Sequence, residues 1–379
     1  MTDEPRTTPT VPSYGDGTLA DLASSLLGSL EVPGEANPLG LPEALRACLL
    51  IVDGLGWELL RDHPAAAPFL SELARAGRPL TAGFPSTTVT SLSSLGTGRP
   101  PGEHGMLGYQ VAIPGTGKLL NGLRWDAHVD PLVWQPGSTV YERAAAAGLG
   151  AFRVAAGAFE KSGFSQAAMR GAAYRPADSL GALAARAGSA LRETDRSLVT
   201  VYVRDLDATG HVFGCGSAAW YYELGHVDRL AEQLASALPS GTRLYVTADH
   251  GMVDVPAAGR IDVDAIPALR EGVALLGGEA RARHVYARPG AAADVLAAWR
   301  DTLAENAWVL SRDAAIGEGW FGPVNDSVAA RIGDVVAAAT GTAAMVATRA
   351  EPRESALVGM HGSLTPAEQL IPLLSHEAL

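Results

Sequence analysis

Cysteine is scarce in this chain, since only Cys48 and Cys215 occur among its 379 residues. Two cysteines cannot form the disulfide framework of a small secreted domain. Cys48 lies in an apolar run of strand length, where a buried thiol is ordinary, and Cys215 lies in a loop flanked by glycines. We therefore expect free thiols and a reducing compartment.

Positive charge is also in short supply. The sequence has 29 Lys and Arg against 41 Asp and Glu, which gives a net charge of -12 and a pI near 5.2. This balance argues against a stable nucleic-acid partner and against binding to an anionic membrane. An anionic substrate must then be attracted locally, which bound metal ions would achieve.

Long hydrophobic runs are missing too, since no stretch reaches the roughly 18 unbroken apolar residues of a membrane span. The N-terminal stretch MTDEPRTTPTVPSYGDG carries acidic residues and three prolines where a signal peptide needs basic residues and then an apolar segment. We expect a cytoplasmic protein. With 43 Gly, 24 Pro and 47% hydrophobic residues, the composition is typical of a globular fold with many turns.

Acidic and histidine side chains follow three apolar runs of strand length. CLLIV ends at Asp53, LVTVYV precedes Asp207 and His211, and RLYVTA ends at Asp249 and His250. Runs that are apolar throughout are typical of parallel strands buried on both faces, whose carboxyl ends share the ligand-binding edge of a sheet. We therefore expect these side chains to lie close together.

Another histidine, His361, lies in the segment GMHGS near the C-terminus. Three Asp and three His at one sheet edge suit two divalent cations with mixed oxygen and nitrogen ligands, zinc above all, with manganese or iron as alternatives. A single Asp at a strand end is often only a helix or turn cap, but the joint occurrence of these motifs favours metal binding. Two such cations suit phosphoryl chemistry.

Apolar strand runs alternate with helical patterns along the chain, which predicts an α/β fold with a doubly wound, mostly parallel sheet and flanking helices. Residues 1–16, polar and proline-rich, are expected to form a flexible tail. The catalytic domain is expected over 17–379, with a small α+β lobe inserted at about 255–345. Helices are predicted over 19–30, over 57–77 with a break at Pro64, from about 88, and over 140–147, 180–191, 218–238, 291–304 and 328–338.

The segment Phe84–Gly98 is rich in hydroxyl groups and has the apolar spacing of a helix that begins near Thr88. A helix N-terminus presents unpaired N–H groups and suits an anion. The turn-rich stretch that follows, as far as about Gly137, is expected to form the rim of the site.

The order of these motifs resembles that of the alkaline phosphatase superfamily, and within it the nucleotide pyrophosphatase/phosphodiesterase branch. The motifs are, in order, the Asp53 segment, FPSTT, the DxxxH of Asp207 and His211, DHG and MHG. The resemblance runs from about Leu49 to His361 and is weak in the rim and the inserted lobe. It implies an alkaline-phosphatase-like fold. It also implies a metal-dependent hydrolase that cleaves phosphate diesters or nucleotide pyrophosphate bonds through a phosphothreonine intermediate.

The resemblance also implies roles for single residues. The Phe-Pro-Thr-Lys pattern of the branch reads Phe84 to Thr87 here, which places the nucleophile at Thr88, with Thr87 and Thr90 as alternatives. Tyr109 takes the substrate-binding position of an Asn, although a phenol cannot both donate and accept as an amide does. One cation is then expected to be held by Asp53, Thr88, Asp249 and His250, and the other by Asp207, His211 and His361.

The expected partner is a small phosphorylated substrate. Phosphonate or phosphomonoester hydrolysis could use the same cations and threonine, whereas a sulfatase is disfavoured because the nucleophile segment has no Cys. The segment Ser86–Leu95 has no basic residue, which favours a diester over a dianionic monoester. An alternative of another class is a non-catalytic metal-binding scaffold, but such a chain would be expected to lose ligands.

Overall fold

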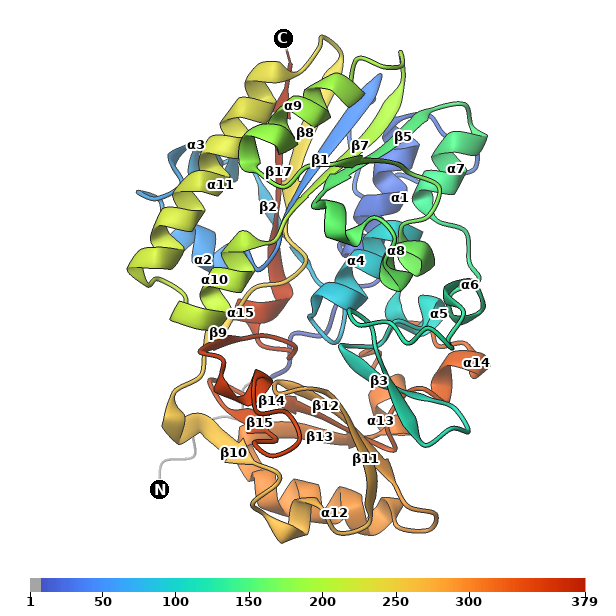
Figure 1. Ribbon diagram of the computed structural model, residues 1–379, viewed down its shortest axis with the longest axis vertical. Coiled ribbons are helices and arrows are strands. Elements are labelled where there is room, and N and C mark those ends of the chain that lie inside the picture. Colours follow the sequence, from blue (N-terminus) through green and yellow to red (C-terminus); the bar gives the residue numbers. More distant parts are fainter. Residues whose placement is uncertain (1–7, 379) are drawn as a thin grey trace.

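Seven strands form the central sheet of the protein, whose computed structural model describes residues 8–378 (Figure 1). Their order is β2-β17-β8-β1-β7-β5-β6. The five strands from β8 to β6 are parallel to one another, and β17 runs antiparallel to β8 and β2. The bounds are β1 Arg46–Val52, β2 Arg78–Thr81, β5 Gly150–Ala155, β6 Ala173–Pro176, β7 Ser197–Val203, β8 Thr242–Thr247 and β17 Leu370–Glu377.

Helices cover both faces of this sheet, which is why β7 is buried along its whole length. One layer contains α1, α4 and α7, and the other contains α3, α9 and α11 (Figure 1). The predicted doubly wound α/β fold is confirmed, and the helix predicted over 57–77 is indeed broken at Pro64. The bounds are α1 Leu19–Ser29, α2 Trp57–Asp62, α3 Pro68–Ala74, α4 Thr88–Thr97, α7 Val140–Ala146, α9 Leu180–Ala190 and α11 Ala218–Ala237.

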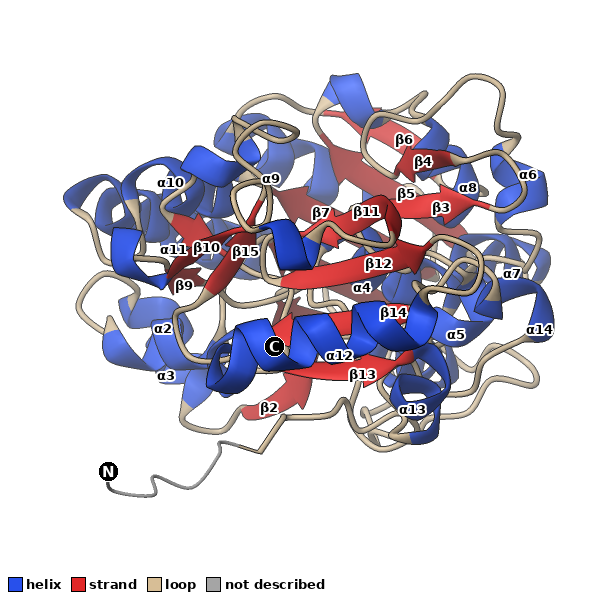
Figure 2. Ribbon diagram, turned by 90° about the horizontal axis from the view of Figure 1, so that it is seen from below, coloured by secondary structure: helices blue, strands red, loops and turns tan. Residues whose placement is uncertain are grey.

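A second, antiparallel sheet lies within the stretch of about 255–345 predicted as an inserted lobe. Its order is β11-β12-β14-β13, and helix α12 packs on it around the buried Trp299 (Figure 2). These elements have a hydrophobic core of their own. The bounds are β11 Val273–Glu279, β12 Ala282–Ala287, α12 Ala292–Leu303, β13 Ala307–Ser311 and β14 Val335–Ala339.

The helix predicted over 328–338 is wrong. A short helix, α14 Asp326–Ala329, is followed by strand β14, in which all five residues of VVAAA are buried. Alanine favours helices in isolation, but here small side chains suit a strand that pairs on both sides and lies under α12. Tertiary packing therefore overrides the local propensity.

The remaining elements form the rim and the connections. Among the described residues, no helix is both long and apolar enough to cross a membrane. The turn-rich stretch after Gly98 contains the hairpin β3–β4. The bounds are α5 Pro101–His104, β3 Gln110–Ile113, β4 Lys118–Asn121, α6 Pro131–Trp134, α8 Gly163–Ala168, α10 Asp205–Phe213, β9 Val253–Asp254, β10 Arg260–Asp262, α13 Arg312–Gly317, β15 Ala344–Val346, β16 Gly359–Met360 and α15 Pro366–Gln369.

Part of the predicted flexible tail, residues 1–7, lies outside the described residues. The chain lies against the body of the protein from Thr10, whose amide donates to the Leu364 carbonyl at 2.8 Å. Val11 packs against the main core, and the Tyr14 hydroxyl donates to the Trp320 carbonyl at 2.9 Å and accepts from the Phe84 amide at 3.1 Å. The Tyr14 contacts connect this stretch to the segment that leads into α4, so the flexible tail predicted as far as residue 16 is wrong for residues 10–14.

Candidate metal centre and active site

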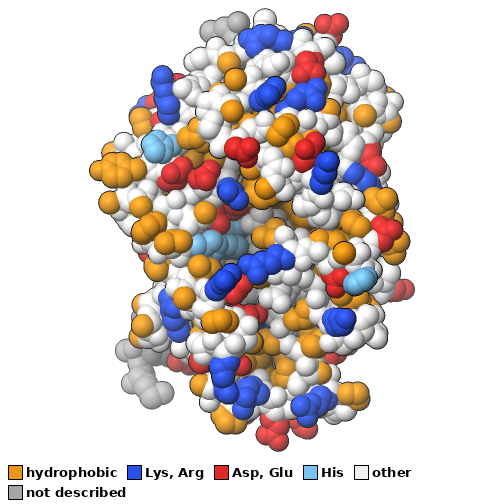
Figure 3. All heavy atoms as spheres, viewed as in Figure 1, with side chains coloured by type: hydrophobic (Ala, Val, Ile, Leu, Met, Phe, Trp, Pro, Cys, Tyr) orange, Lys and Arg blue, Asp and Glu red, His pale blue; other side chains and the backbone are white. Residues whose placement is uncertain are grey.

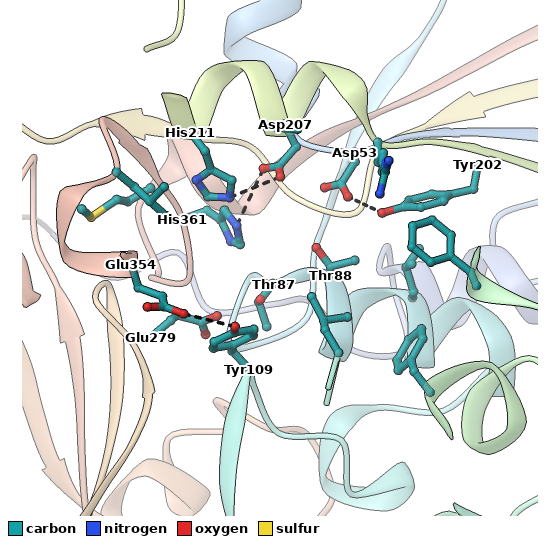
Figure 4. A pocket seen from close by; sticks show the side chains of 18 of the residues that line it. Asp53, Thr87, Thr88, Tyr109, Tyr202, Asp207, His211, Glu279, Glu354 and His361 are labelled. Carbon is teal, nitrogen blue, oxygen red and sulfur yellow. Dashed lines mark hydrogen bonds and ion pairs between the residues drawn. The ribbon is translucent and has the colours of Figure 1, made fainter. Parts of the chain in front are cut away.

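The carboxyl ends of three adjacent parallel strands deliver the acidic side chains (Figure 4). Asp53 follows β1 directly, and Asp249 lies two residues beyond the end of β8. Helix α10 begins just after β7 and places Asp207 and His211 one turn apart on the same face. Gly54, with φ 76°, is needed here because a Cβ atom would lie 3.0 Å from Cβ of Asp207.

Three histidines complete this cluster. The ring centroids of His250 and His361 are 3.6 Å apart, and those of His211 and His361 are 5.2 Å apart. His361 comes from the loop after β16, more than a hundred residues from the other two. The predicted segments therefore meet at one place, although they are distant in sequence.

Each of these histidines has its Nδ1 atom against a backbone carbonyl. His211 Nδ1 lies 2.7 Å from the Gly359 oxygen, His250 Nδ1 lies 3.0 Å from the Gly251 oxygen, and His361 Nδ1 lies 2.9 Å from the Ser86 oxygen. A carbonyl can only accept, so each Nδ1 carries a proton, and Nε2 is the ring atom left to bind a metal ion. This is the arrangement of metal-ligating histidines, whose second nitrogen is held by a hydrogen bond.

Three buried carboxylate oxygens near the histidine Nε2 atoms have no hydrogen-bond partner. Asp53 Oδ1, Asp207 Oδ1 and Asp249 Oδ2 are shielded from solvent and have no hydrogen-bond partner. Buried polar atoms are normally paired, and oxygen atoms left in this way beside imidazole nitrogens fit divalent cations. The donor set therefore fits the metal ions that the motifs predict.

The ligand atoms fall into two groups, each within 4.8 Å. One group contains Asp207, His211 and His361, and the other contains Asp53, Asp207 and His250. Asp207 thus lies in both groups, whereas the resemblance assigned it to one cation only. Asp249 stays next to the second group, with Oδ2 3.6 Å from Nε2 of His250.

Without a bound cation, the neighbouring carboxylates of the cluster repel one another, and this repulsion shifts their pKa values. Burial and the nearby carboxylates of Asp249 and Asp207 raise the pKa of Asp53 well above its usual value. Burial alone would raise the pKa of Asp207, but the imidazoles of His211 and His361 lower it overall. Burial and the neighbouring His250 lower the pKa of His361. Cations would relieve the repulsion between the carboxylates.

The candidate nucleophile stands at the start of α4. Thr88 is the first residue of the helix, and its Oγ1 lies 3.4 Å from Nε2 of His250. Thr87 precedes it and also lines the pocket, whereas Thr90 is fully buried and does not line it. Of the three threonines considered from the sequence, Thr88 is the one in contact with the histidine cluster.

A pocket of about 450 Å³ opens over this cluster between the main sheet and the second one. Figure 3 shows histidines inside a hollow of the surface, with basic side chains at its edge. Tyr109 lines the pocket, and its hydroxyl donates to Oε1 of Glu354 at 3.4 Å (Figure 4). The tyrosine that replaces the expected Asn therefore lies at the site, held by a carboxylate of the opposite wall.

Several pocket residues were not found from the sequence. Tyr202 donates its hydroxyl proton to Asp53 Oδ2, but within LVTVYV it looks like any buried strand residue. Arg153 lies in the short strand segment AFRVA, which has no motif. Glu279 comes from the second sheet, and no local pattern links it to the ligands. Only long-range folding brings these residues together.

Glu279 gives a pH-dependent prediction. Burial raises its pKa to about 8, and its Oε1 atom has no hydrogen-bond partner. The folded state then keeps a proton that the unfolded state releases, so stability falls as pH rises from about 4.5 to about 8. In the metal-free proteins, the free energy of unfolding of Glu279→Gln should therefore rise relative to that of wild type, by on the order of 2 kcal/mol over this pH range. The difference stays this small because the Glu279 side chain is partly exposed to solvent.

Urea unfolding of both chelated proteins at several pH values measures this gain. The matched control is Glu72→Gln, whose side chain is 63% exposed and which should follow wild type. Parallel stability curves for Glu279→Gln and wild type would show that Glu279 is not protonated at neutral pH.

A sequence model described as Type I phosphodiesterase / nucleotide pyrophosphatase matches residues 47–364, which include all seven predicted ligand positions. The chain belongs to this family. It is therefore a phosphoric ester hydrolase of the alkaline phosphatase superfamily, and the predicted family is confirmed. A search of curated proteins finds no match.

Solved structures of this type share the fold of the phosphodiesterase chain. Murine ectonucleotide pyrophosphatase/phosphodiesterase 5, an inactive form in complex with AMP, has a TM-score of 0.70 at 21% identity over 87% of both chains. Phosphonoacetate hydrolase from Sinorhizobium meliloti 1021, in complex with phosphonoformate, has a TM-score of 0.67 at 20% identity over 89% of this chain and 91% of that one. At such identities the likeness shows the fold alone.

Proposed function

We propose that this phosphodiesterase-family protein hydrolyses phosphate diesters or nucleotide pyrophosphate bonds at a two-cation site, with Thr88 as the nucleophile. The observation that carries the proposal is the set of three buried carboxylate oxygens without hydrogen-bond partners beside three histidines whose Nε2 atoms face the carboxylates. A scaffold that only kept the fold would have no need to leave these atoms unpaired, because unpaired buried polar groups cost stability.

Two divalent cations in such a site lower the pKa of a coordinated hydroxyl and neutralise the charge of a phosphoryl group. Asp53, Thr88, Asp249 and His250 would hold one, and Asp207, His211 and His361 would hold the other, with Asp207 present in both groups of ligand atoms. Zinc is the expected metal, because mixed Asp and His ligands suit it.

The chain itself supplies the positions of the reacting groups. Thr88 Oγ1 points at the cluster from the first turn of α4. Its attack on phosphorus would break the bond to the leaving alcohol or phosphate and form a phosphothreonine, and attack by water would then break the bond to Thr88 and release the remaining phosphoryl product. The first N–H groups of α4 have no intrahelical acceptor and lie beside Thr88, where they can donate to phosphoryl oxygens. Tyr202 holds Asp53 in place through its hydroxyl.

The charge of the pocket favours a diester. Three arginines line it, but Arg153 is separated from Asp53 by the ring of Tyr202, and Arg353 and Arg204 are exposed at the rim. No basic residue of α4 stands beside Thr88 to hold a second free oxygen. A dianionic monoester therefore lacks the arginine contact that would compensate its extra charge.

We expect kcat/KM for an aryl phosphodiester to exceed that for the matching aryl monoester by about tenfold, as one charge-assisted contact would account for such a factor. Both substrates, with an aryl pyrophosphate and a phosphonate as further arms, are to be compared at one pH and one metal load. A clear preference for the monoester or the phosphonate would overturn the diesterase assignment.

A further inference from the structure

Arg153 is a buried cation that no acidic group neutralises. It lies on β5, is 2% exposed and lines the pocket. Its Nε and Nη1 atoms have no hydrogen-bond partner, and it forms no ion pair with a described residue. A guanidinium keeps its charge at all physiological pH values, so burying it without a counter-ion costs free energy.

The other deeply buried arginines of the described chain form ion pairs with carboxylates. Arg281 and Arg283 are both 0% exposed, and each is ion-paired, Arg281 with Glu368 at 2.5 Å and Arg283 with Glu351 at 2.8 Å. They also donate to backbone carbonyls. Burial of an arginine in this protein is therefore accompanied by a carboxylate, except where the arginine faces the pocket.

The place of Arg153 relative to the cluster is fixed by the sheet. β5 is two strands away from β1, and Arg153 is level with Leu49, four residues before Asp53, so the two positions are about 16 Å apart. Tyr202 of the intervening strand lies between them, and the Arg153 guanidinium carbon is 5.8 Å from its ring centroid. Phe159, Phe164 and Leu92 also line the pocket, and the ring centroid of Phe159 lies 6.1 Å from that of Tyr202.

We propose that Arg153 binds a second anionic group of the substrate, a carboxylate or a phosphate, carried on the ester arm beyond Tyr202. The inference rests on the proposed function and names its substrate class, namely phosphodiesters or pyrophosphates with an arm that crosses an apolar stretch and ends in an oxyanion. The unpartnered Nε and Nη1 atoms of the guanidinium can each donate a charge-assisted hydrogen bond to such an oxyanion. In a chain of net charge -12, this cation provides the local attraction that the arm requires.

A purely structural role makes a different prediction. Arg153 stacks on Tyr202, and that contact alone could help Tyr202 to hold Asp53. Loss of such support would weaken all substrates alike, because it would act through the metal centre. Loss of an anion contact would affect only substrates that carry the second anion.

The test measures the binding of inert probes to the zinc-loaded protein by titration calorimetry. The probes are alkylphosphonates of increasing chain length that end in a methyl, a carboxylate or a second phosphonate group. At the best length, wild type should bind an anion-ended probe at least about tenfold more tightly than its methyl-ended counterpart. The preferred end group, carboxylate or phosphonate, then identifies the source of the anion.

Arg153→Gln should bring the anion-ended and methyl-ended probes to within about twofold of each other, with the affinity for the methyl-ended probe unchanged. Arg153→Lys keeps the positive charge but not the position of the guanidinium donors, so it should retain part of the preference, which covers the case of a Gln variant that does not fold. The matched control is Arg175→Gln. Arg175 lies on the neighbouring strand β6 and stacks over Phe152, but it is paired with Glu193 and does not line the pocket.

Equal affinities in wild type, or an Arg153→Gln variant that weakens all probes alike, would overturn the inference and leave the proposed function in place. Failure of every probe to bind the zinc-loaded protein, the methyl-ended ones included, would instead contradict the proposed function and the inference with it.

Discussion

Replacing Thr88 by alanine is expected to lower kcat by at least about a thousandfold, because removal of a nucleophile leaves only binding and electrostatic contributions. The fold and most of the metal content should persist, since the six Asp and His ligands remain. Steady-state kinetics with an aryl phosphodiester measures the loss, and metal analysis checks the site.

Thr90→Val is the matched control for this variant. Thr90 lies in the same helix, is buried and does not line the pocket, and valine has nearly its shape, so its activity should stay close to that of wild type. An active Thr88→Ala enzyme together with an inactive Thr87→Val enzyme would show that the nucleophile is Thr87.

Replacing Asp207 by alanine is expected to remove both cations and with them all measurable turnover. The structure places Asp207 in both groups of ligand atoms, whereas His211 belongs to one. His211→Ala should therefore lose about one cation per chain while Asp207→Ala loses about two, because affinity falls with each ligand removed. If each variant loses only one cation, Asp207 binds a single cation, as the family resemblance implied, and the prediction is wrong.

The sequence predicted that these acidic segments meet at one edge of the sheet, and the structure brings them together for a physical reason. Asp53, Asp207 and Asp249 follow apolar strands, and parallel strands must end at a common edge, so strand order alone brings these residues together. The helix predicted over 328–338 was wrong because the alanines of β14 were judged by their intrinsic propensity, while their conformation is decided by pairing with β12 and β13.

Residues whose role depends on distant neighbours could not be predicted in this way. Glu279 reaches the pocket from the second sheet, and Arg153 is distinctive only because its surroundings contain no carboxylate. The family resemblance implied a place at the site for Tyr109, but its partner Glu354 is 245 positions away. Such features arise from tertiary packing rather than from a local pattern. The cytoplasmic location and the identity of the metal stay predictions.

The central claim is that two cations at this cluster support turnover by Thr88. Metal analysis of the purified protein, combined with activity during stepwise reloading of the chelated enzyme with zinc, tests it most directly. The account predicts that activity is absent without metal and reaches its maximum at about two cations per chain. Full activity with one cation or none would contradict it.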